Sequence, residues 1–293
     1  SLYKLWGNDL LTEAQALNQS APLDLRVNTL KSNRESTLFL LKKEGVEGTY
    51  TTISPVGLRI ANKINIQGTK TFKKGLIEIQ DEGSQIIALL CEAGPNMKVI
   101  DFCAGSGGKT LALASTMKNL GEIRAYDTSH KRLAKIKQRL KRAGVTNVEY
   151  SVINKPNYTK VLKNNIMADR VLCDVPCSGS GTWRRNPEIK FHLTKHDLRI
   201  LCETQKEILT QASLLVKTGG RLIYSTCSIL PEENNEQVSW FKSHFKKFKI
   251  FPISNITADQ LPEHSMLNCK VLHLTPEKTN TDGFFCAIFQ KVR

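Results

Sequence analysis

The feature that most constrains the fold is an alternation of strand-like and helix-like segments that begins after Gly75. Short apolar runs predict strands at residues 98–102, 123–126, 148–153, 168–173, 221–225, 250–253 and 284–290. Amphipathic segments predict helices at residues 84–92, 109–117, 129–143, 194–217 and 232–245. This alternation predicts an α/β fold, with a doubly wound and mostly parallel sheet that helices cover on both faces. Because the last strand follows a loop, we expect an antiparallel hairpin at the sheet edge.

The segment before this alternation has a different pattern. It predicts a helix over residues 1–20, a strand over 23–27, a helix over 36–43 and strand-like alternation over 49–66. We therefore expect a small α+β domain at residues 1–74, followed by a larger domain at residues 75–293. The small domain is rich in lysine and arginine. Such charges form either a solvated surface or a platform for nucleic acid, and this segment alone does not separate the two.

Charge and cysteine content limit the partners and the compartment. The chain of 293 residues has a formal net charge of +15 and a sequence pI near 9.5, which favours a polyanionic partner. No apolar run approaches the roughly 18 residues of a membrane span, so we expect no membrane partner. The eight cysteines include no CxxC pair, so we expect no metal. They fit a reducing, cytoplasmic compartment better than a disulfide scaffold.

A glycine-rich turn links the strand at 98–102 to the next helix. It reads Asp101-Phe-Cys-Ala-Gly-Ser-Gly-Gly-Lys-Thr110, and such a turn lets the backbone approach a ligand closely. A Walker A loop would need glycine in place of Cys103, and a dinucleotide fingerprint would need glycine or alanine in place of Thr110. Asp127 ends the next strand, where Rossmann-like folds hold ribose hydroxyls. The glycine-rich turn and Asp127 together suggest a nucleoside ligand without a pyrophosphate, such as S-adenosylmethionine. The alternative is an ordinary tight turn with a surface aspartate.

The stretch from Asp169 to Pro187 places a carboxyl group, a thiol and basic side chains after one predicted strand. Asp174 and Cys177 lie where the strand ends, and Pro176 directs the backbone out of the sheet. Ligands bind at such carboxyl ends in open α/β sheets. A tryptophan and two arginines follow at residues 183–185, and these residue types stack on bases and hold phosphates. The alternative is that the cysteines are small core residues.

A second thiol, Cys227, follows the strand predicted at 221–225. If this strand lies beside the strand that ends before Asp174, two thiols and a carboxyl group face one crevice. The two cysteine motifs then belong to one site.

These motifs together resemble those of RsmB-like (Sun-family) RNA cytosine-5 methyltransferases, and the resemblance extends over essentially the whole chain. It is carried by the glycine-rich turn, by Asp174-Val-Pro-Cys-Ser-Gly-Ser-Gly181 with Arg184-Arg-Asn-Pro187, and by Ser225-Thr-Cys-Ser228 with Pro231-Glu-Glu-Asn234. Further matches are Leu25-Arg-Val-Asn-Thr-Leu30, Gln80-Asp-Glu-Gly-Ser-Gln85 and Asp282-Gly-Phe-Phe285. DNA cytosine-5 enzymes, by contrast, use the Pro-Cys cysteine as nucleophile and lack the Thr-Cys one.

The resemblance implies a Rossmann-like class I methyltransferase fold with a seven-stranded sheet, preceded by a small RNA-binding domain. It implies methyl transfer from S-adenosylmethionine to carbon 5 of a cytosine in RNA, through a covalent Cys–cytosine intermediate. We expect ribosomal RNA as the substrate and a monomeric enzyme. A tRNA substrate stays open, because RNA specificity depends on shape and loop contacts. A catalytically silent RNA-binding protein is the other alternative, and the intact catalytic set argues against it.

The resemblance also gives a role to each catalytic residue. Cys227 would attack carbon 6 as a thiolate, and Cys177 would assist its elimination from the methylated base. Asp174, when protonated, would donate to ring nitrogen 3, which requires a raised pKa. Lys109 is the candidate that makes the site electropositive.

The cofactor would be held at three places. Asp127 would take the ribose, with Arg132 as a nearby support, and Asp174 also counts among the expected cofactor-binding residues. The family's third binding acid corresponds to Asn154 here, which brings an acceptor oxygen but no charge. The residues expected around the methionine end are Cys103, Ala104, Gly105, Ser106, Gly107, Gly108 and Lys109.

Overall fold

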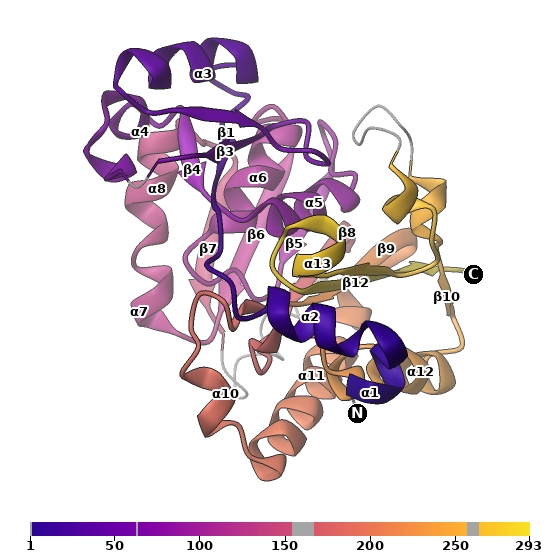
Figure 1. Cartoon of the computed structure of the whole chain (residues 1–293). Coiled ribbons are helices and arrows are strands. Elements are labelled where there is room, and N and C mark those ends of the chain that lie inside the picture. Colours follow the sequence, from indigo (N-terminus) through magenta and orange to yellow (C-terminus); the bar gives the residue numbers. More distant parts are fainter. Residues whose placement is uncertain (1, 63, 154–166, 257–263) are drawn as a thin grey trace.

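Two β-sheets form the framework of the structure (Figure 1). The strands of the small sheet come early in the sequence, and the strands of the large sheet come from the rest of the chain. The computed structural model describes residues 2–62, 64–153, 167–256 and 264–293. None of the helices in these ranges has the length and apolar character that crossing a membrane requires.

The small sheet has four strands with antiparallel neighbours and its own apolar core. Its strands are β1 (Leu23–Val27), β2 (Gly48–Tyr50), β3 (Gly57–Ile60) and β4 (Ile77–Ile79), in the order β2-β3-β1-β4. It is accompanied by α3 (Arg34–Lys43), η2 (Ile66–Gly68) and α4 (Lys70–Lys73). Leu25 of β1, Leu58 of β3 and Ile77 of β4 are fully buried against Leu41 of α3. Burying one face of the sheet in this way makes it a stable layer.

The small domain agrees with the sequence in outline but not in every element. The strand predicted at 23–27 is confirmed by β1. The helix predicted over 1–20 is divided into α1 (Leu2–Trp6), η1 (Gly7–Asp9) and α2 (Leu10–Ala16), with Gly7 at a φ of +50°. No strand was predicted at β4, which pairs with β1 and so carries the small sheet past residue 74. The boundary expected between residues 74 and 75 stays a prediction.

The large sheet follows the order β10-β12-β9-β8-β5-β6-β7, and an eighth strand, β11, pairs with β12. Its strands are β5 (Lys98–Asp101), β6 (Glu122–Asp127), β7 (Val148–Val152), β8 (Ala168–Asp174), β9 (Val216–Thr226), β10 (Phe248–Ile250), β11 (Leu272–Leu274) and β12 (Phe284–Lys291). Strands β5 to β9 pair in parallel, whereas β12 is antiparallel to β9 and β10. The predicted mostly parallel sheet is therefore confirmed, and its antiparallel strands lie on one side of β9. The last strand, β12, lies between β9 and β10 instead of forming a hairpin at the edge.

Helices cover both faces of this sheet. The longer helices are α5 (Glu82–Leu90), α6 (Gly108–Thr116), α8 (Ile136–Ala143), α11 (Lys195–Leu215) and α12 (Asn235–His244). The short ones are α7 (His130–Leu133), η4 (Ser180–Thr182), α10 (Ile189–His192), η5 (Pro231–Glu233), η6 (Ile253–Asn255), η7 (Ser265–Leu267) and α13 (Pro276–Thr279). Neighbouring residues of a strand point to opposite faces. Accordingly, Val99 and Leu172 pack with α5, α6 and α8, while Ile100 and Val171 pack with α11 and α12.

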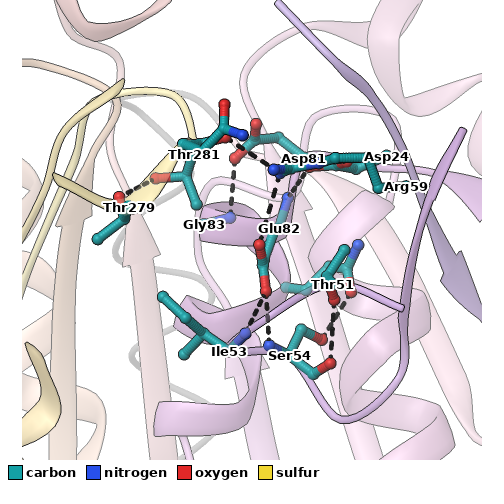
Figure 2. Close-up of polar contacts among 12 residues, drawn as sticks. Asp24, Thr51, Ile53, Ser54, Arg59, Asp81, Glu82, Gly83, Thr279 and Thr281 are labelled. Carbon is teal, nitrogen blue, oxygen red and sulfur yellow. Dashed lines mark hydrogen bonds and ion pairs between the residues drawn. The ribbon is translucent and has the colours of Figure 1, made fainter. Parts of the chain in front are cut away.

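A buried polar junction joins the two sheets at the start of α5 (Figure 2). Arg59 of β3 donates through Nε and an Nη to the two carboxylate oxygens of Asp24, both at 2.8 Å. The Glu82 backbone N–H donates to Asp24 at 3.2 Å. Glu82 Oε1 in turn accepts from the backbone N–H groups of Ile53 and Ser54, at 2.6 and 2.8 Å. The small sheet is therefore hydrogen-bonded to the first turn of α5, beside the large sheet.

We expect Asp24→Ala to lower the free energy of unfolding by about 3–5 kcal/mol, because it removes one partner of a buried ion pair. The Asp24 side chain is fully buried, and the Arg59 Nε and the Glu82 N–H would lose their acceptor. Urea denaturation followed by circular dichroism measures the change. The exposed Glu47 is the control, and Glu47→Ala is expected to change stability by no more than about 0.5 kcal/mol. Equal effects of the two substitutions would contradict the assignment of Asp24 to the junction.

Candidate active site

A cavity of about 720 Å³ opens at the carboxyl ends of the parallel strands. Ligand sites in open α/β sheets lie at this place, and small-molecule sites typically measure about 300–1,000 Å³. Its lining comes from the segments that follow β4, β5, β6, β8 and β9, and from the loop before β12. Of the predicted catalytic and cofactor-binding residues in the described ranges, all except Gly107 line the cavity. Asn154 lies outside the described residues.

The glycine-rich turn between β5 and α6 needs glycine at two positions. Gly107 has a φ of +85°, and a Cβ added there would lie 2.5 Å from the Ile136 side chain. Gly107 therefore packs against α8 instead of lining the cavity. Gly105 has a φ of +57° and lines the cavity, and an added Cβ would meet nothing within 4 Å. The backbone at Gly105 is thus open to a ligand.

Asp127, at the end of β6, holds this turn in place. One carboxylate oxygen accepts from the Gly105 backbone N–H at 2.8 Å. The other accepts from the Ser129 backbone N–H at 2.7 Å and from Arg132 at 2.9 Å. The Asp127 side chain is 2% exposed, whereas that of Arg132 is 57% exposed. A carboxylate has about four acceptor positions, so these three contacts leave capacity for one more donor.

Lys109 and Asp174 form an ion pair in the cavity wall. The Lys109 Nζ donates to Asp174 Oδ2 at 2.7 Å, and Ser225 Oγ donates to Asp174 Oδ1 at 2.9 Å. Burial of the Lys109 ammonium lowers its pKa, but the charge of Asp174 and the hydrogen bond to it outweigh burial. The pKa of Lys109 is therefore raised, and the cavity wall keeps a cation at this residue.

The two thiols of the sequence motifs are in contact. Cys177 Sγ and Cys227 Sγ are 3.4 Å apart. The cause is the pairing of β8 with β9, in which Asp174 lies beside Ser225. The prediction that these two strands are neighbours is confirmed.

The two thiols differ in their surroundings. The contact with Cys227 raises the pKa of Cys177 well above its usual value, and burial adds to this effect. Cys177 is therefore held as a thiol, which can donate its proton toward Cys227. Cys227 and Lys109 both line the cavity. Of the two thiols, Cys177 is the poorer candidate for a thiolate nucleophile.

A buried carboxylate that was not predicted as a site residue fixes the loop after Cys177. Glu233 is fully buried and accepts from the Ser178 backbone N–H at 2.9 Å and from the Ser178 hydroxyl at 2.5 Å. It also accepts from the Gln205 side chain at 2.9 Å. Glu233 belongs to the Pro-Glu-Glu-Asn motif, which is visible in the sequence. The role of Glu233 depends on its contact with Ser178, which lies 55 residues earlier in the chain.

Arg184 and Arg185, expected to hold phosphates, are engaged by carboxylates. Arg184 Nε lies 2.6 Å from Asp282 Oδ1, and the Arg184 side chain is 3% exposed. Arg185 pairs with Asp282 and also with Asp81, at 3.0 Å from the latter, and it lines the cavity. Arg184 is therefore a buried link between loops, and only Arg185 of the two faces the cavity.

The described residues contain neither a disulfide nor a recognisable metal cluster. All eight cysteines are free thiols. Across the residues that the structure describes, no group of three or more His, Cys, Asp or Glu side chains could hold a metal ion.

Comparison with protein families matches nearly the whole chain. The model of the 16S rRNA methyltransferase RsmB/F family matches residues 88–290. The model of the ferredoxin-like domain of RsmF/B-like methyltransferases matches residues 1–67.

Curated relatives and a solved structure agree with this match. The ribosomal RNA small subunit methyltransferase B of Proteus mirabilis is 33% identical over 275 residues, which are 94% of this chain and 60% of the relative. That of Pseudomonas syringae pv. tomato is 33% identical over 292 residues, or 100% of this chain and 64% of the relative. The chain thus spans about three-fifths of the length of these relatives. The crystal structure of a methyltransferase homolog protein from Pyrococcus horikoshii superposes with a TM-score of 0.84 at 31% identity, covering 99% of this chain and 93% of that one. The chain belongs to the RsmB/F family of 16S rRNA methyltransferases.

Proposed function

We propose that the chain methylates carbon 5 of a cytosine in ribosomal RNA, with S-adenosylmethionine as methyl donor. The observation that carries the proposal is the 3.4 Å contact between Cys177 and Cys227 in a cavity that also holds the Lys109–Asp174 pair. Carbon 5 of cytosine is a poor nucleophile, and addition of a thiolate to carbon 6 turns the ring into an enamine. Membership of an rRNA methyltransferase family supports the reaction class and the RNA substrate.

The residues of the cavity fit S-adenosylmethionine. The backbone at Gly105 is open to the cavity, and Asp127 keeps acceptor capacity for a ribose hydroxyl. The turn at residues 103–109 would hold the methionine end, with Arg132 beside the ribose. When bound, the cofactor supplies an electrophilic methyl group. The contact of Asn154 with the adenine stays a prediction.

Cys227 is the group that attacks carbon 6. It shares the cavity wall with the Lys109 ammonium, whose charge would stabilise a thiolate, and it is in contact with the Cys177 thiol. Only a thiolate is a strong nucleophile, and Cys177 is held as a thiol.

Asp174 and Lys109 would bind the N3 edge of the ring. Asp174 is held by Lys109 on one oxygen and by Ser225 on the other, so its orientation is set before the base arrives. Hydrogen bonds to this edge would stabilise the charge that develops when the thiolate adds. After the methyl group is in place, the carbon 5 proton leaves and Cys227 departs. Cys177 would assist that departure because it is a thiol in contact with the leaving sulfur.

The small domain offers a surface suited to single-stranded RNA. Phe39 is 58% exposed and Tyr50 is 45% exposed. The Lys43 ammonium lies 4.3 Å from the centroid of the Phe39 ring, and the Arg34 guanidinium 4.1 Å from that of Tyr50. Aromatic faces with cations beside them bind bases and phosphates. We propose that residues 1–74 form an RNA-binding domain.

Two other functions compete with this one. A tRNA substrate would use the same chemistry, but the curated relatives are named for the small-subunit ribosomal RNA. A silent RNA-binding protein would not need two thiols in contact beside a buried lysine. We further propose a cytoplasmic enzyme, because all eight cysteines are free thiols. The expected monomeric state stays a prediction.

The direct test is incubation of the purified protein with S-adenosylmethionine and either small-subunit ribosomal RNA or tRNA, followed by bisulfite sequencing. We expect a protected cytosine in the ribosomal RNA. Protection in tRNA alone would replace the substrate assignment, and protection in neither, under conditions in which cofactor binds, would favour the silent protein.

Asp127→Ala is expected to weaken cofactor binding about ten- to a hundred-fold, because it removes a charged acceptor from the ribose site and releases the Gly105 turn. Isothermal calorimetry with S-adenosylmethionine measures the affinity. Asp169→Ala is the matched control, since Asp169 lies near the opposite end of β8 and pairs with Lys217. An unchanged affinity in a folded Asp127→Ala variant would contradict the ribose assignment.

The two thiols are expected to give opposite results in an adduct assay. Cys227→Ser should abolish methylation without a covalent RNA adduct, because a hydroxyl is a much weaker nucleophile. Cys177→Ser should still attack and transfer the methyl group, and then stall as a protein–RNA adduct that survives denaturing electrophoresis.

Cys269→Ser is the control for this assay and should behave as the unsubstituted protein, since Cys269 is not among the residues that line the cavity. An adduct trapped by Cys227→Ser but not by Cys177→Ser would reverse the two roles.

A further inference from the structure

Three arginines and one glutamate meet where the small sheet packs against α8. Glu78 of β4 accepts from Arg139 at 2.8 Å and from Arg142 through its other oxygen. Arg26 lies directly opposite Glu78 in the pairing of β1 with β4, and its Nε donates to the neutral side-chain oxygen of Gln80 at 2.7 Å. The Glu78 carboxylate is thus paired with two guanidinium groups and lies opposite the residue that carries the third. This cluster has more positive than negative charge.

The excess positive charge of this cluster has less access to water than the charge of a surface patch would have. Arg26 is 3% exposed and the Glu78 side chain is 4% exposed. The pKa of Arg26 is lowered to about 10, mainly by burial, while the charge of Glu78 opposes this decrease and that of Arg139 adds to it. A concentration of cations with limited access to water favours the binding of an anion.

Of these arginines, Arg139 is the one that reaches the cavity. Its side chain lines the cavity and is 21% exposed. One Nη donates to the Ser106 backbone oxygen at 3.0 Å and to the Ser106 hydroxyl at 2.9 Å, and the other Nη donates to Glu78. These contacts use three of the five N–H donors of a guanidinium. Within the part of the chain that the structure describes, two N–H donors of Arg139 are left for a ligand.

Arg142 lies one turn further along α8 and is oriented differently. Its guanidinium lies 3.9 Å from the centroid of the Phe72 ring, in the small domain. It shares Glu78 with Arg139 but belongs to the domain contact rather than to the cavity.

We propose that Arg139 binds the carboxylate of the methionine moiety of the cofactor. The inference rests on the proposed function, because it assumes that S-adenosylmethionine enters the cavity. The methionine moiety carries the anionic group of this cofactor, and Arg139 holds Ser106 within the turn assigned to that moiety. A guanidinium presents paired donors that match a carboxylate. Glu78 of β4 orients Arg139 from the small sheet.

The test compares two ligands that differ by one carboxylate. Calorimetry with S-adenosylmethionine and with decarboxylated S-adenosylmethionine is run on the unsubstituted protein, Arg139→Gln and Arg142→Gln. Arg139→Gln is expected to lose about ten- to a hundred-fold in affinity for S-adenosylmethionine and none for the decarboxylated ligand. Arg142→Gln, the matched control, should leave both affinities unchanged. Arg139→Lys, which keeps the charge with fewer donors, should lose less than Arg139→Gln.

Three results would overturn the proposal. Equal losses for both ligands would mean that Arg139 only holds the turn, and unchanged affinity for both would mean that it has no part in binding. A loss of affinity for a single-stranded RNA oligonucleotide, with cofactor affinity unchanged, would assign the anion to an RNA phosphate. If the unsubstituted protein binds neither adenosyl ligand, the proposed function itself fails, and this result is independent of the variants.

Discussion

The parallel pairing of β8 with β9 is the constraint on which the site depends. It places Asp174 beside Ser225 and brings together two thiols that are 50 residues apart in the chain. Both strands are buried on both faces, so a shift of one residue would exchange their faces and is strongly disfavoured. Because the register cannot change, the geometry of the thiols and of the Lys109–Asp174 pair is set before any substrate binds. Such preorganisation is how an active site stabilises charge that develops during a reaction.

The contact between the small and large sheets is polar and buried, so breaking it costs more free energy than breaking a contact at the surface. Glu82 connects the loop at residues 53–54 to α5, and Glu78 connects β4 to Arg139 and so to the turn at Ser106. Buried hydrogen-bonded networks are costly to break, because each lost partner leaves an unsatisfied group. The domain proposed to bind RNA is therefore joined to the segment proposed to hold the cofactor through a few specific side chains.

Periodicity predicted the long elements of the large sheet and failed for short ones. The strands β5 to β8 lie close to their predicted ranges, whereas β9 begins five residues before its predicted range. The strands β4 and β11 and the helix α10 have three or four residues, too few to show a period, and they form because a neighbouring segment pairs or packs with them. The predicted helix at 129–143 is divided into α7 and α8, and Arg184 is buried against Asp282. Local sequence shows neither the break nor the partner.

The sequence by itself determined the chemical groups of this protein: two thiols, a lysine, an aspartate and a glycine-rich turn at the ends of predicted strands. These signals are local, since they depend on residue type and on spacing along one segment. The tertiary structure alone decided which groups meet and how their properties differ. It placed Cys177 against Cys227, and it brought Glu233 to Ser178 and Arg139 to Ser106. These contacts join residues that are 33 to 55 positions apart in the chain. Strand order and burial bring such residues together, so the local sequence does not show that they meet.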